Sequence, residues 1–327
     1  MQIPQHIIGA DLSKATIDLF CRSHLQIENS STGFKQMMKW LKQQNINTPE
    51  MIIVMEHTGL YSYCFEHFLH DHSIAFCKVN AYAVKHSIGL VRGKSDRIDA
   101  RRLADYGLEK KNKLIIEPLA SKELQRLQML YTTRERLVRH KAALINSVKM
   151  YQGIGLAAHN PVIKSQLRLI KSFEKEIKTL QDQMDQIIEM SPSIKQNQCL
   201  LQSIKGVGKV LSVAMIIKTR NFTRFQNARK FACFCGTAPF EHTSGSSIRG
   251  KTKVSRFADK TMKTLLDLSA KSAIQYDKEL REYYLRRTEN GKPKMSTINI
   301  IRNKILYRMF AVIKRQTPYV ENYKQAA

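Results

Sequence analysis

Two aspartates three residues apart form the pair in this sequence that is best suited to metal chemistry. Asp96 and Asp99 follow Ser95, which can cap a helix, and the next Gly or Pro is Gly107. Residues three apart share a helix face, and two carboxylates about 4 Å apart repel by roughly 4 kcal/mol at an effective dielectric of about 20. Mg²⁺ prefers such oxygen ligands, so the spacing predicts either a metal site or a solvated pair bound to nearby arginines.

Two further acids stand at the ends of predicted strands. Residues 7–11 and 51–56 are apolar runs that close on Asp11 and Glu56. Strands of this kind would bring both acids to one edge of a sheet, where the helix with Asp96 and Asp99 could complete a nest of four carboxylates. Such a nest binds Mg²⁺ and can activate a phosphodiester by Lewis-acid or two-metal chemistry.

The segments around these acids predict an α/β domain. Residues 16–21 and 24–28 alternate as strands do, and residues 74–79 form another apolar strand-like run. Residues 32–44 and 58–71 have the apolar spacing of helices. The predicted order is three strands, a helix, a strand, a helix, a strand and then helices.

The charge of the chain indicates a polyanionic partner. The 327 residues include 54 Lys and Arg against 27 Asp and Glu, a formal net charge of +27. Nucleic acid is the usual partner of a protein this basic. No run approaches the roughly 18 apolar residues of a membrane helix, and the N-terminus lacks the parts of a signal peptide. We therefore expect a cytoplasmic protein without a membrane partner.

The cysteines and a group of histidines do not predict a metal site. None of the six cysteines forms a CxxC pair, so we expect reduced thiols rather than disulfides or zinc ligands. His67, His70 and His72 lie close together without an accompanying cysteine, which favours a surface helix.

Three short stretches resemble the DEDD transposases of bacterial insertion sequences. They are Ile-Gly-Ala-Asp at 8–11, Met-Glu-His-Thr-Gly at 55–59 and Lys-Ser-Asp-Arg-Ile-Asp-Ala at 94–100. The resemblance implies that residues 1–118 form a RuvC-type, RNase H-like domain. It also implies a Mg²⁺-binding catalytic tetrad of Asp11, Glu56, Asp96 and Asp99. Acids that match no tetrad position are expected to be structural, and these are Asp18, Asp71 and Asp105.

Residues 119–195 predict a helical connector. Residues 121–150 contain no Gly or Pro and carry a stripe of leucines, and apolar residues from Ile170 to Ile187 step by three and four. The two helices could pack on each other within one chain or form a seam between subunits. In the DEDD transposases this region is a coiled coil that helps subunits assemble, so the resemblance implies a dimer, and a tetramer when active.

Residues 196–327 form a basic, mostly α-helical part. From residue 205 onward there are 26 Lys and Arg against 8 Asp and Glu. Residues 200–211 resemble a helix-hairpin-helix, in which glycines allow a tight turn and backbone N–H groups can hold a phosphate. An ordinary glycine turn is the alternative. The candidate nucleic-acid contacts here are Lys205, Gly206, Gly208 and Lys209.

A serine-rich loop follows in the same part of the chain. Ser244, Ser246 and Ser247 precede a run of cations, and alone this pattern predicts a basic loop that hydrogen-bonds phosphate. A serine nucleophile also needs help to lose its proton and to stabilise the attacked group. The candidate nucleic-acid contacts are Arg249, Lys251, Lys253 and Arg256. Farther on, Tyr283, Tyr284, Arg286 and Arg287 suit either nucleic-acid contact or packing between two predicted helices, 257–274 and 297–313.

The loop resembles the Ser-Gly-Ser-Ser-x-Arg-Gly segment of the same transposases. The resemblance implies that Ser244 is the nucleophile, with Ser246 and Ser247 as the alternatives. It implies a site-specific DNA recombinase that forms a covalent phosphoserine link and chooses its DNA through a structured guide RNA. Two other functions stay open, a junction-cutting nuclease that uses metal-activated water and a non-catalytic nucleic-acid binder.

Overall fold

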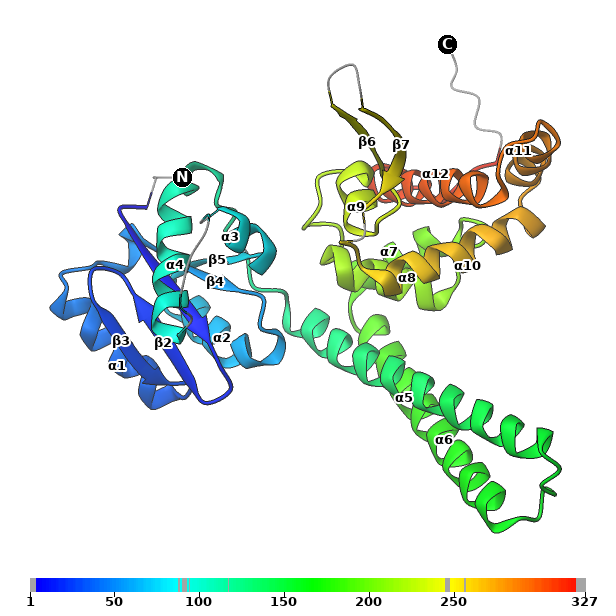
Figure 1. The fold of residues 1–327 in the computed structure, drawn as a ribbon, viewed down its shortest axis with the longest axis horizontal. Helices are drawn as coiled ribbons and strands as arrows, with labels where there is room; N and C mark the ends of the chain where they lie inside the picture. The colour runs from blue at the N-terminus through cyan, green and yellow to red at the C-terminus, as the bar shows by residue number, and fades with distance from the viewer. Residues whose placement is uncertain are drawn as a thin grey trace. The chain divides into compact units, whose positions relative to one another are not determined.

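The chain folds into two compact units, Met1–Leu119 and Ala120–Ala327. The computed structural model describes residues 4–87, 89, 93, 95–116, 118–244, 248–255 and 257–321. Figure 1 shows that the first unit is built on a β-sheet with helices, whereas the second is mainly helical. The predicted change from an α/β domain to a mostly α part is therefore confirmed.

The first unit contains a five-stranded mixed sheet. Its order is β3-β2-β1-β4-β5, in which β1 to β3 pair antiparallel and β4 and β5 run parallel to β1. All five predicted strands are confirmed. Their bounds are β1 His6–Leu12, β2 Thr16–Phe20, β3 His24–Glu28, β4 Met51–Glu56 and β5 Ala75–Val79.

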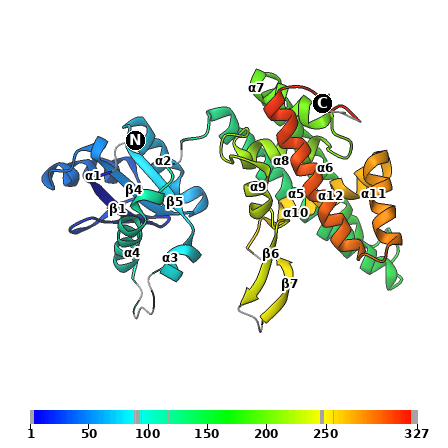
Figure 2. The same cartoon turned by 90° about the horizontal axis from the view of Figure 1, so that it is seen from above.

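Helices cover both faces of this sheet, as Figures 1 and 2 show. On one face, Ile8 and Ala10 join a core with α1 (Ser31–Gln43) and α2 (Tyr63–Asp71), which includes Trp40, the only tryptophan. On the other face, Ile7 packs in a core with residues of α3 (Ala81–Ser87) and α4 (Asp96–Glu109). Alternate side chains of β1 therefore serve opposite faces. Short 3₁₀ turns complete the unit at Thr48–Glu50, Gly59–Ser62 and Lys111–Lys113.

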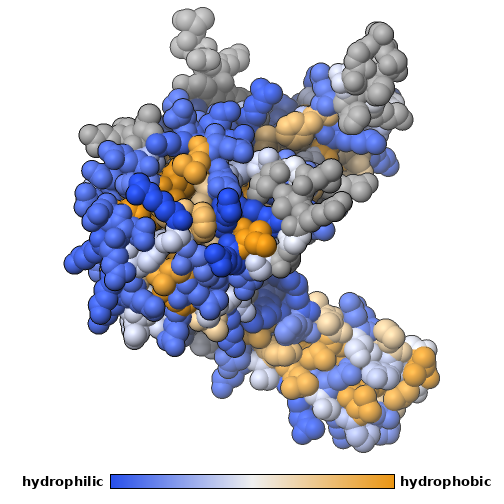
Figure 3. Space-filling model, turned by 60° about the vertical axis from the view of Figure 1, so that its left-hand side comes forward, coloured by the Kyte–Doolittle hydropathy of each residue, from blue (hydrophilic) through white to orange (hydrophobic). Residues whose placement is uncertain are grey.

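The second unit begins with a helical hairpin. Helix α5 (Lys122–Gly153) packs against α6 (Pro161–Glu189), and Val148, Ile163 and Ile170 are buried between them. Packing within one chain, one of the two predicted alternatives, is thus observed. Several apolar side chains remain exposed on the hairpin, which is the lower projection in Figure 3. They include Met150, Ile154, Leu169 and Met190.

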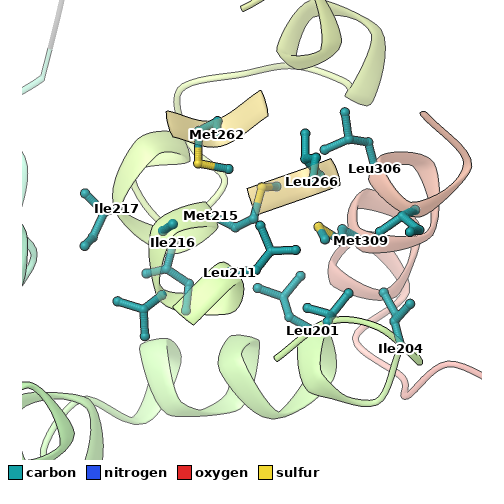
Figure 4. Close-up of a cluster of buried hydrophobic side chains, with 14 of the residues drawn as sticks. Leu201, Ile204, Leu211, Met215, Ile216, Ile217, Met262, Leu266, Leu306 and Met309 are labelled. Carbon is teal, nitrogen blue, oxygen red and sulfur yellow. The ribbon is translucent and has the colours of Figure 1, made fainter. Parts of the chain in front are cut away.

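The rest of the second unit is built around one core, part of which Figure 4 shows. Leu201, Leu211, Met215, Leu266 and Met309 meet there from different helices. Residues of α5 and α6 also join this core. The elements are α7 Pro192–Gln202, α8 Lys209–Thr219, α9 Ala228–Phe234, β6 Pro239–Ser244, β7 Ile248–Val254, α10 Lys260–Tyr276, α11 Lys278–Glu289 and α12 Lys294–Arg315.

Three further expectations can be compared with these elements. Helix α11 was not predicted, because its sequence has little apolar periodicity. In the structure it buries only Leu280, and Asp277 caps it by accepting a hydrogen bond from the Leu280 N–H. All six cysteines are free thiols. Among the described residues, every helix is too short or too polar to cross a bilayer.

Candidate functional site

Glycine in β1 allows helix α4 to approach the sheet very closely. A Cβ atom on Gly9 would lie 1.9 Å from the Ala100 carbonyl oxygen and 2.5 Å from the Ala104 nitrogen. On the helix side, a Cβ on Gly107 would lie 2.6 Å from Ile7 Cγ2. Only glycine fits such contacts, so the short distance between α4 and β1 depends on Gly9 and Gly107.

The same contacts fix the direction of α4. Gly107 lies over Ile7, whereas Ala100 and Ala104 lie over Gly9, so the helix runs antiparallel to β1. Its first turn therefore lies at the end of β1 that carries Asp11. Ser95 caps this turn by accepting a hydrogen bond from the Ile98 N–H at 3.3 Å, which confirms the predicted helix start.

The four predicted acids gather at this edge of the sheet. Asp11 stands near the end of β1 and Glu56 ends the neighbouring parallel strand β4. Asp96 and Asp99 lie in the first turn of α4. Burial, followed by the charges of Asp99, Asp96, Glu56 and Asp18, raises the pKa of Asp11 to about 6. The carboxylates are thus close enough to act on one another.

The acids form a loose cluster rather than a closed cage. In the part of the chain that the structure describes, no three His, Cys, Asp or Glu side chains are arranged to hold a metal ion. The Arg102 guanidinium donates hydrogen bonds to the Asp99 carboxylate at 2.7 Å and to the Gly93 carbonyl at 3.0 Å, so one of the four acids is paired with a cation.

The sequence analysis missed the place of Asp18 beside this cluster. Asp18 is directly opposite Asp11 in the β1–β2 pairing and is buried, with 3% of its surface exposed. The hairpin spacing was an available signal, because it also sets Leu12 opposite Ile17. Asp71 and Asp105 were expected to be structural; they lie at the end of α2 and on the outer side of α4.

In the second unit, α7 and α8 are joined by the predicted glycine turn. Gly206 has a φ of 89°, and a Cβ there would lie 2.7 Å from the Ser269 carbonyl oxygen, so glycine is required. Gly208 precedes α8 with an extended backbone. Lys205 Nζ lies 2.5 Å from Glu321, and Lys209 Nζ lies 2.5 Å from Asp185. Both predicted phosphate-binding lysines are therefore paired with carboxylates.

The serine-rich stretch, predicted from sequence as a basic loop, is carried by a β-hairpin of β6 and β7. Ser244 ends β6, and its backbone is opposite Ile248 of β7. Ser246, Ser247 and Arg256 lie outside the described residues. The other predicted cations of this region all stand on β7, and they are Arg249, Lys251 and Lys253.

The tyrosine and arginine residues of α11 pack together. Tyr283 and Tyr284 are half-buried against the core of the second unit. The Lys304 ammonium lies 4.8 Å from the centre of the Tyr283 ring, and the guanidinium carbons of Arg286 and Arg287 lie 5.8 Å from it. This arrangement agrees with the packing alternative for the tyrosines.

Comparisons with known proteins agree with these two groups of residues. A model of IS110-type DEDD transposases matches residues 9–151, a range that contains the four acids. A second model, described as the transposase IS116/IS110/IS902 family, matches residues 198–285, a range that contains the glycine turn and the serine hairpin. The two matches together span more than half of the chain.

Two relatives are similar to this chain over nearly its full length, and others are similar over part of it. The chain is 26% identical to the pilin gene-inverting protein of Moraxella bovis over 95% of this chain and 97% of the relative, and the Moraxella lacunata protein of the same name is equally similar. The transposase for insertion sequence element IS1111A of Coxiella burnetii is 24% identical over 57% of this chain and 56% of that protein. With both models matched in order along one polypeptide, the chain belongs to the IS110 family of DEDD transposases, enzymes that cleave and rejoin DNA.

Proposed function

We propose that this transposase is a Mg²⁺-dependent, site-specific recombinase of an insertion sequence. The observation that carries the proposal is the placement of the four acids at one edge of the sheet. Asp11 and Glu56 lie at the ends of the parallel strands β1 and β4, and the first turn of α4, with Asp96 and Asp99, lies at the same end of β1. The first unit would then have a RuvC-type, RNase H-like fold. Its strand order, with Asp11 on β1 and Glu56 on the parallel neighbour β4, supports that assignment.

The donor set fits a divalent cation. DEDD transposases generally use divalent metal ions. Burial and then the charges of the neighbouring acids raise the pKa of Asp11 to about 6, and a cation would relieve the repulsion between those acids. Asp11, Glu56, Asp96 and Asp99 would hold Mg²⁺, which supplies Lewis-acid stabilisation of a phosphate when bound. Arg102 binds Oδ1 of Asp99, so this carboxylate would bind the metal through its other oxygen or after releasing Arg102.

The nucleophile in our proposal is Ser244. Its Oγ would lose its proton and form a bond to a DNA phosphorus, while the bond from that phosphorus to one deoxyribose oxygen breaks and leaves a hydroxyl. A strand hydroxyl would later attack the phosphoserine and release the serine. The place of Ser244 at the end of β6, opposite the cationic strand β7, supports this role.

The remaining elements would serve recognition and assembly. A structured guide RNA would select the DNA by base pairing, and the +27 charge supports binding of both nucleic acids. We propose a connector at residues 119–195 between the domains at 1–118 and 196–327. Exposed apolar residues on its hairpin, such as Met150 and Ile154, support a homodimer that pairs into an active tetramer on nucleoid DNA in the cytoplasm.

Trapping of the protein on DNA tests the proposal. Protein with its guide RNA, DNA and Mg²⁺ is quenched in denaturant, and protein–DNA adducts are separated by size. The wild-type protein should leave an adduct that Ser244→Ala abolishes, whereas Ser246→Ala and Ser247→Ala should retain it. Asp11→Asn should abolish both the adduct and strand exchange.

The same assay separates the alternative function. If Ser244→Ala still cuts DNA and leaves free ends without adduct, the chain is a metal-dependent nuclease that uses activated water. An adduct that persists in Ser244→Ala but not in Ser246→Ala or Ser247→Ala would move the nucleophile to that serine.

A further inference from the structure

A buried carboxylate faces the proposed metal site from the neighbouring strand. Asp18 of β2 is the direct cross-strand partner of Asp11 of β1. Side chains opposite each other in an antiparallel pair share a face, with Cβ atoms typically about 4.5–5.5 Å apart. Like charges in such positions destabilise a sheet, so a second aspartate opposite Asp11 needs an explanation.

Asp18 is held firmly in place. One of its oxygens lies 2.6 Å from His24 Nε2 and the other accepts a hydrogen bond from Gln26 Nε2 at 3.1 Å. Both partners are on β3, where Gln26 is directly opposite Asp18. With 3% of its surface exposed, Asp18 has been removed from water almost completely. The carboxylate therefore has a fixed position and both of its oxygens are bound.

Burying a carboxylate at position 18 costs free energy, and the fold itself does not require a charged residue there. Burying a carboxylate is unfavourable even when it is hydrogen-bonded, and an apolar residue of similar size is often as stable or more stable. On the other face of the same strand, Ile17 and Leu19 fill the core in the ordinary way. After burial and the charges of Asp99, Asp96 and Glu56, the charge of Asp18 is the smallest of the causes that raise the pKa of Asp11, and it acts in the same direction.

We infer that Asp18 is a positioning residue for the proposed metal site. Fixed by His24 and Gln26, it repels the Asp11 carboxylate toward Glu56, Asp96 and Asp99 and adds negative charge that strengthens binding of a divalent cation. This inference rests on the proposed metal-dependent function, but it makes a separate prediction about affinity. The metal would be bound by the four acids, with Asp18 acting through Asp11.

Metal binding without DNA tests this role. The fluorescence of Trp40, the only tryptophan, reports unfolding of the first unit, and its thermal midpoint can be followed while Mg²⁺ or Mn²⁺ alone is titrated. Asp18→Asn should raise the half-effective cation concentration about five- to tenfold, because one nearby charge is lost. Asp71→Asn, which removes the same charge at the exposed end of α2, should leave it within about twofold of the wild-type value.

A second variant keeps the inference testable if Asp18→Asn does not fold. His24→Gln retains the Asp18 charge but replaces one of the two groups that fix it, and it should weaken cation binding about two- to threefold. Equal half-effective concentrations for the wild type and the folded Asp18 variant would show a purely structural role and overturn the inference. The wild type should be stabilised by added cation, and Asp11→Asn should remove that stabilisation. If either result is not obtained, the proposed metal site itself is wrong.

Discussion

The acid cluster of the first unit and the glycine turn of the second unit treat charge in opposite ways. Burial and the charges of four neighbouring carboxylates raise the pKa of Asp11 to about 6, so negative charge is concentrated around this residue. At the glycine turn, Lys205 and Lys209 are each paired with a carboxylate 2.5 Å away. Although Arg102 binds Asp99, the first region keeps an excess of negative charge, whereas each lysine of the glycine turn is balanced by one acid.

The difference indicates what each region requires from its ligand. The acid cluster gains free energy when a cation enters, because repulsion already present in the folded protein is relieved. When a phosphate binds a lysine of the glycine turn, it displaces a carboxylate. The gain in binding free energy is therefore only the difference between the two interactions. We therefore expect substitutions in the first region to have large effects on stability and metal binding, and substitutions of the lysine partners to have small effects on DNA affinity.

The largest effect is expected from Gly9→Ala, which would move α4 and its two acids away from β1. The added Cβ would lie 1.9 Å from a backbone oxygen of α4, so the helix must shift. We expect a loss of about 3 kcal/mol or more in the free energy of unfolding of the first unit, with loss of the cation response. Chemical denaturation followed by Trp40 fluorescence measures this loss.

Gly59→Ala is the matched control for that substitution. Gly59 has a φ of 70°, but a Cβ there meets no atom within 4 Å, so only backbone strain is added. Its cost should be about 1 to 2 kcal/mol. If Gly9→Ala cost no more than Gly59→Ala, the close approach of α4 would not be what holds the acids together.

A smaller effect is expected from Asp11→Asn, measured as a function of pH with a chelator present. The folded pKa of Asp11, about 6, is above its ordinary value of 3.8, so protonation stabilises the folded state. In the wild type this contribution is complete below about pH 4 and is lost as the pH rises through 6. The asparagine variant does not titrate, so its stability relative to wild type should increase across that range.

The size of the relative gain follows from the pKa difference. A shift of this size corresponds to about 3 kcal/mol at full coupling, and solvent screening around the half-buried Asp11 reduces this to about 1 to 2 kcal/mol. Denaturation curves followed by Trp40 fluorescence at pH 4 and pH 7.5 give the difference in the free energy of unfolding between variant and wild type at each pH. Equal stability differences between variant and wild type at both pH values would mean that neither burial nor neighbouring charge raises the pKa of Asp11 in solution.

Local sequence patterns were sufficient for most of the first unit. Apolar alternation and apolar runs predicted the five strands, and Ser95 followed by a helix-forming stretch predicted the start of α4. The strand ends then placed Asp11 and Glu56 at one edge. These features depend on residues close together in the chain, which is why spacing alone revealed them.

Features that depend on distant partners were not predicted. Nothing near Lys205 indicates that Glu321 would bind it. The Asp99–Arg102 pair is different, because it joins residues three apart and is the arginine pairing that the sequence predicted as the alternative to a metal site. The opposition of Asp18 and Asp11 required the register of the β1–β2 hairpin. Helix α11 has a weak apolar pattern, so its cap at Asp277 and its packing had to be seen in the structure.

Asp185→Asn would release Lys209 from its carboxylate partner at the glycine turn. The pair is partly exposed, and such pairs contribute little, so we expect duplex DNA to bind about two- to fivefold more tightly at low salt. If the freed lysine then contacts a phosphate, the slope of log affinity against log salt should steepen by about 0.9. Binding titrations at several salt concentrations measure both quantities.

Two controls separate pairing from net charge in that experiment. Asp182→Asn removes the same charge from an exposed position of α6 and should change affinity less. Adding Lys209→Ala to Asp185→Asn should cancel the gain. A gain that survives the loss of Lys209 would mean that the lysine is not the group released.

The smallest effect is expected from Glu321→Gln at the other lysine of the glycine turn. Lys205 and Glu321 are both about half-exposed, so water already competes for each of them and removing the acid should strengthen DNA binding by at most about twofold. Glu289→Gln, at an exposed position of α11, is the control for net charge. If Glu321→Gln exceeded Asp185→Asn in effect, Glu321 would be blocking access to the turn rather than neutralising a lysine, because the exposed pair cannot supply a larger electrostatic gain than the more buried one.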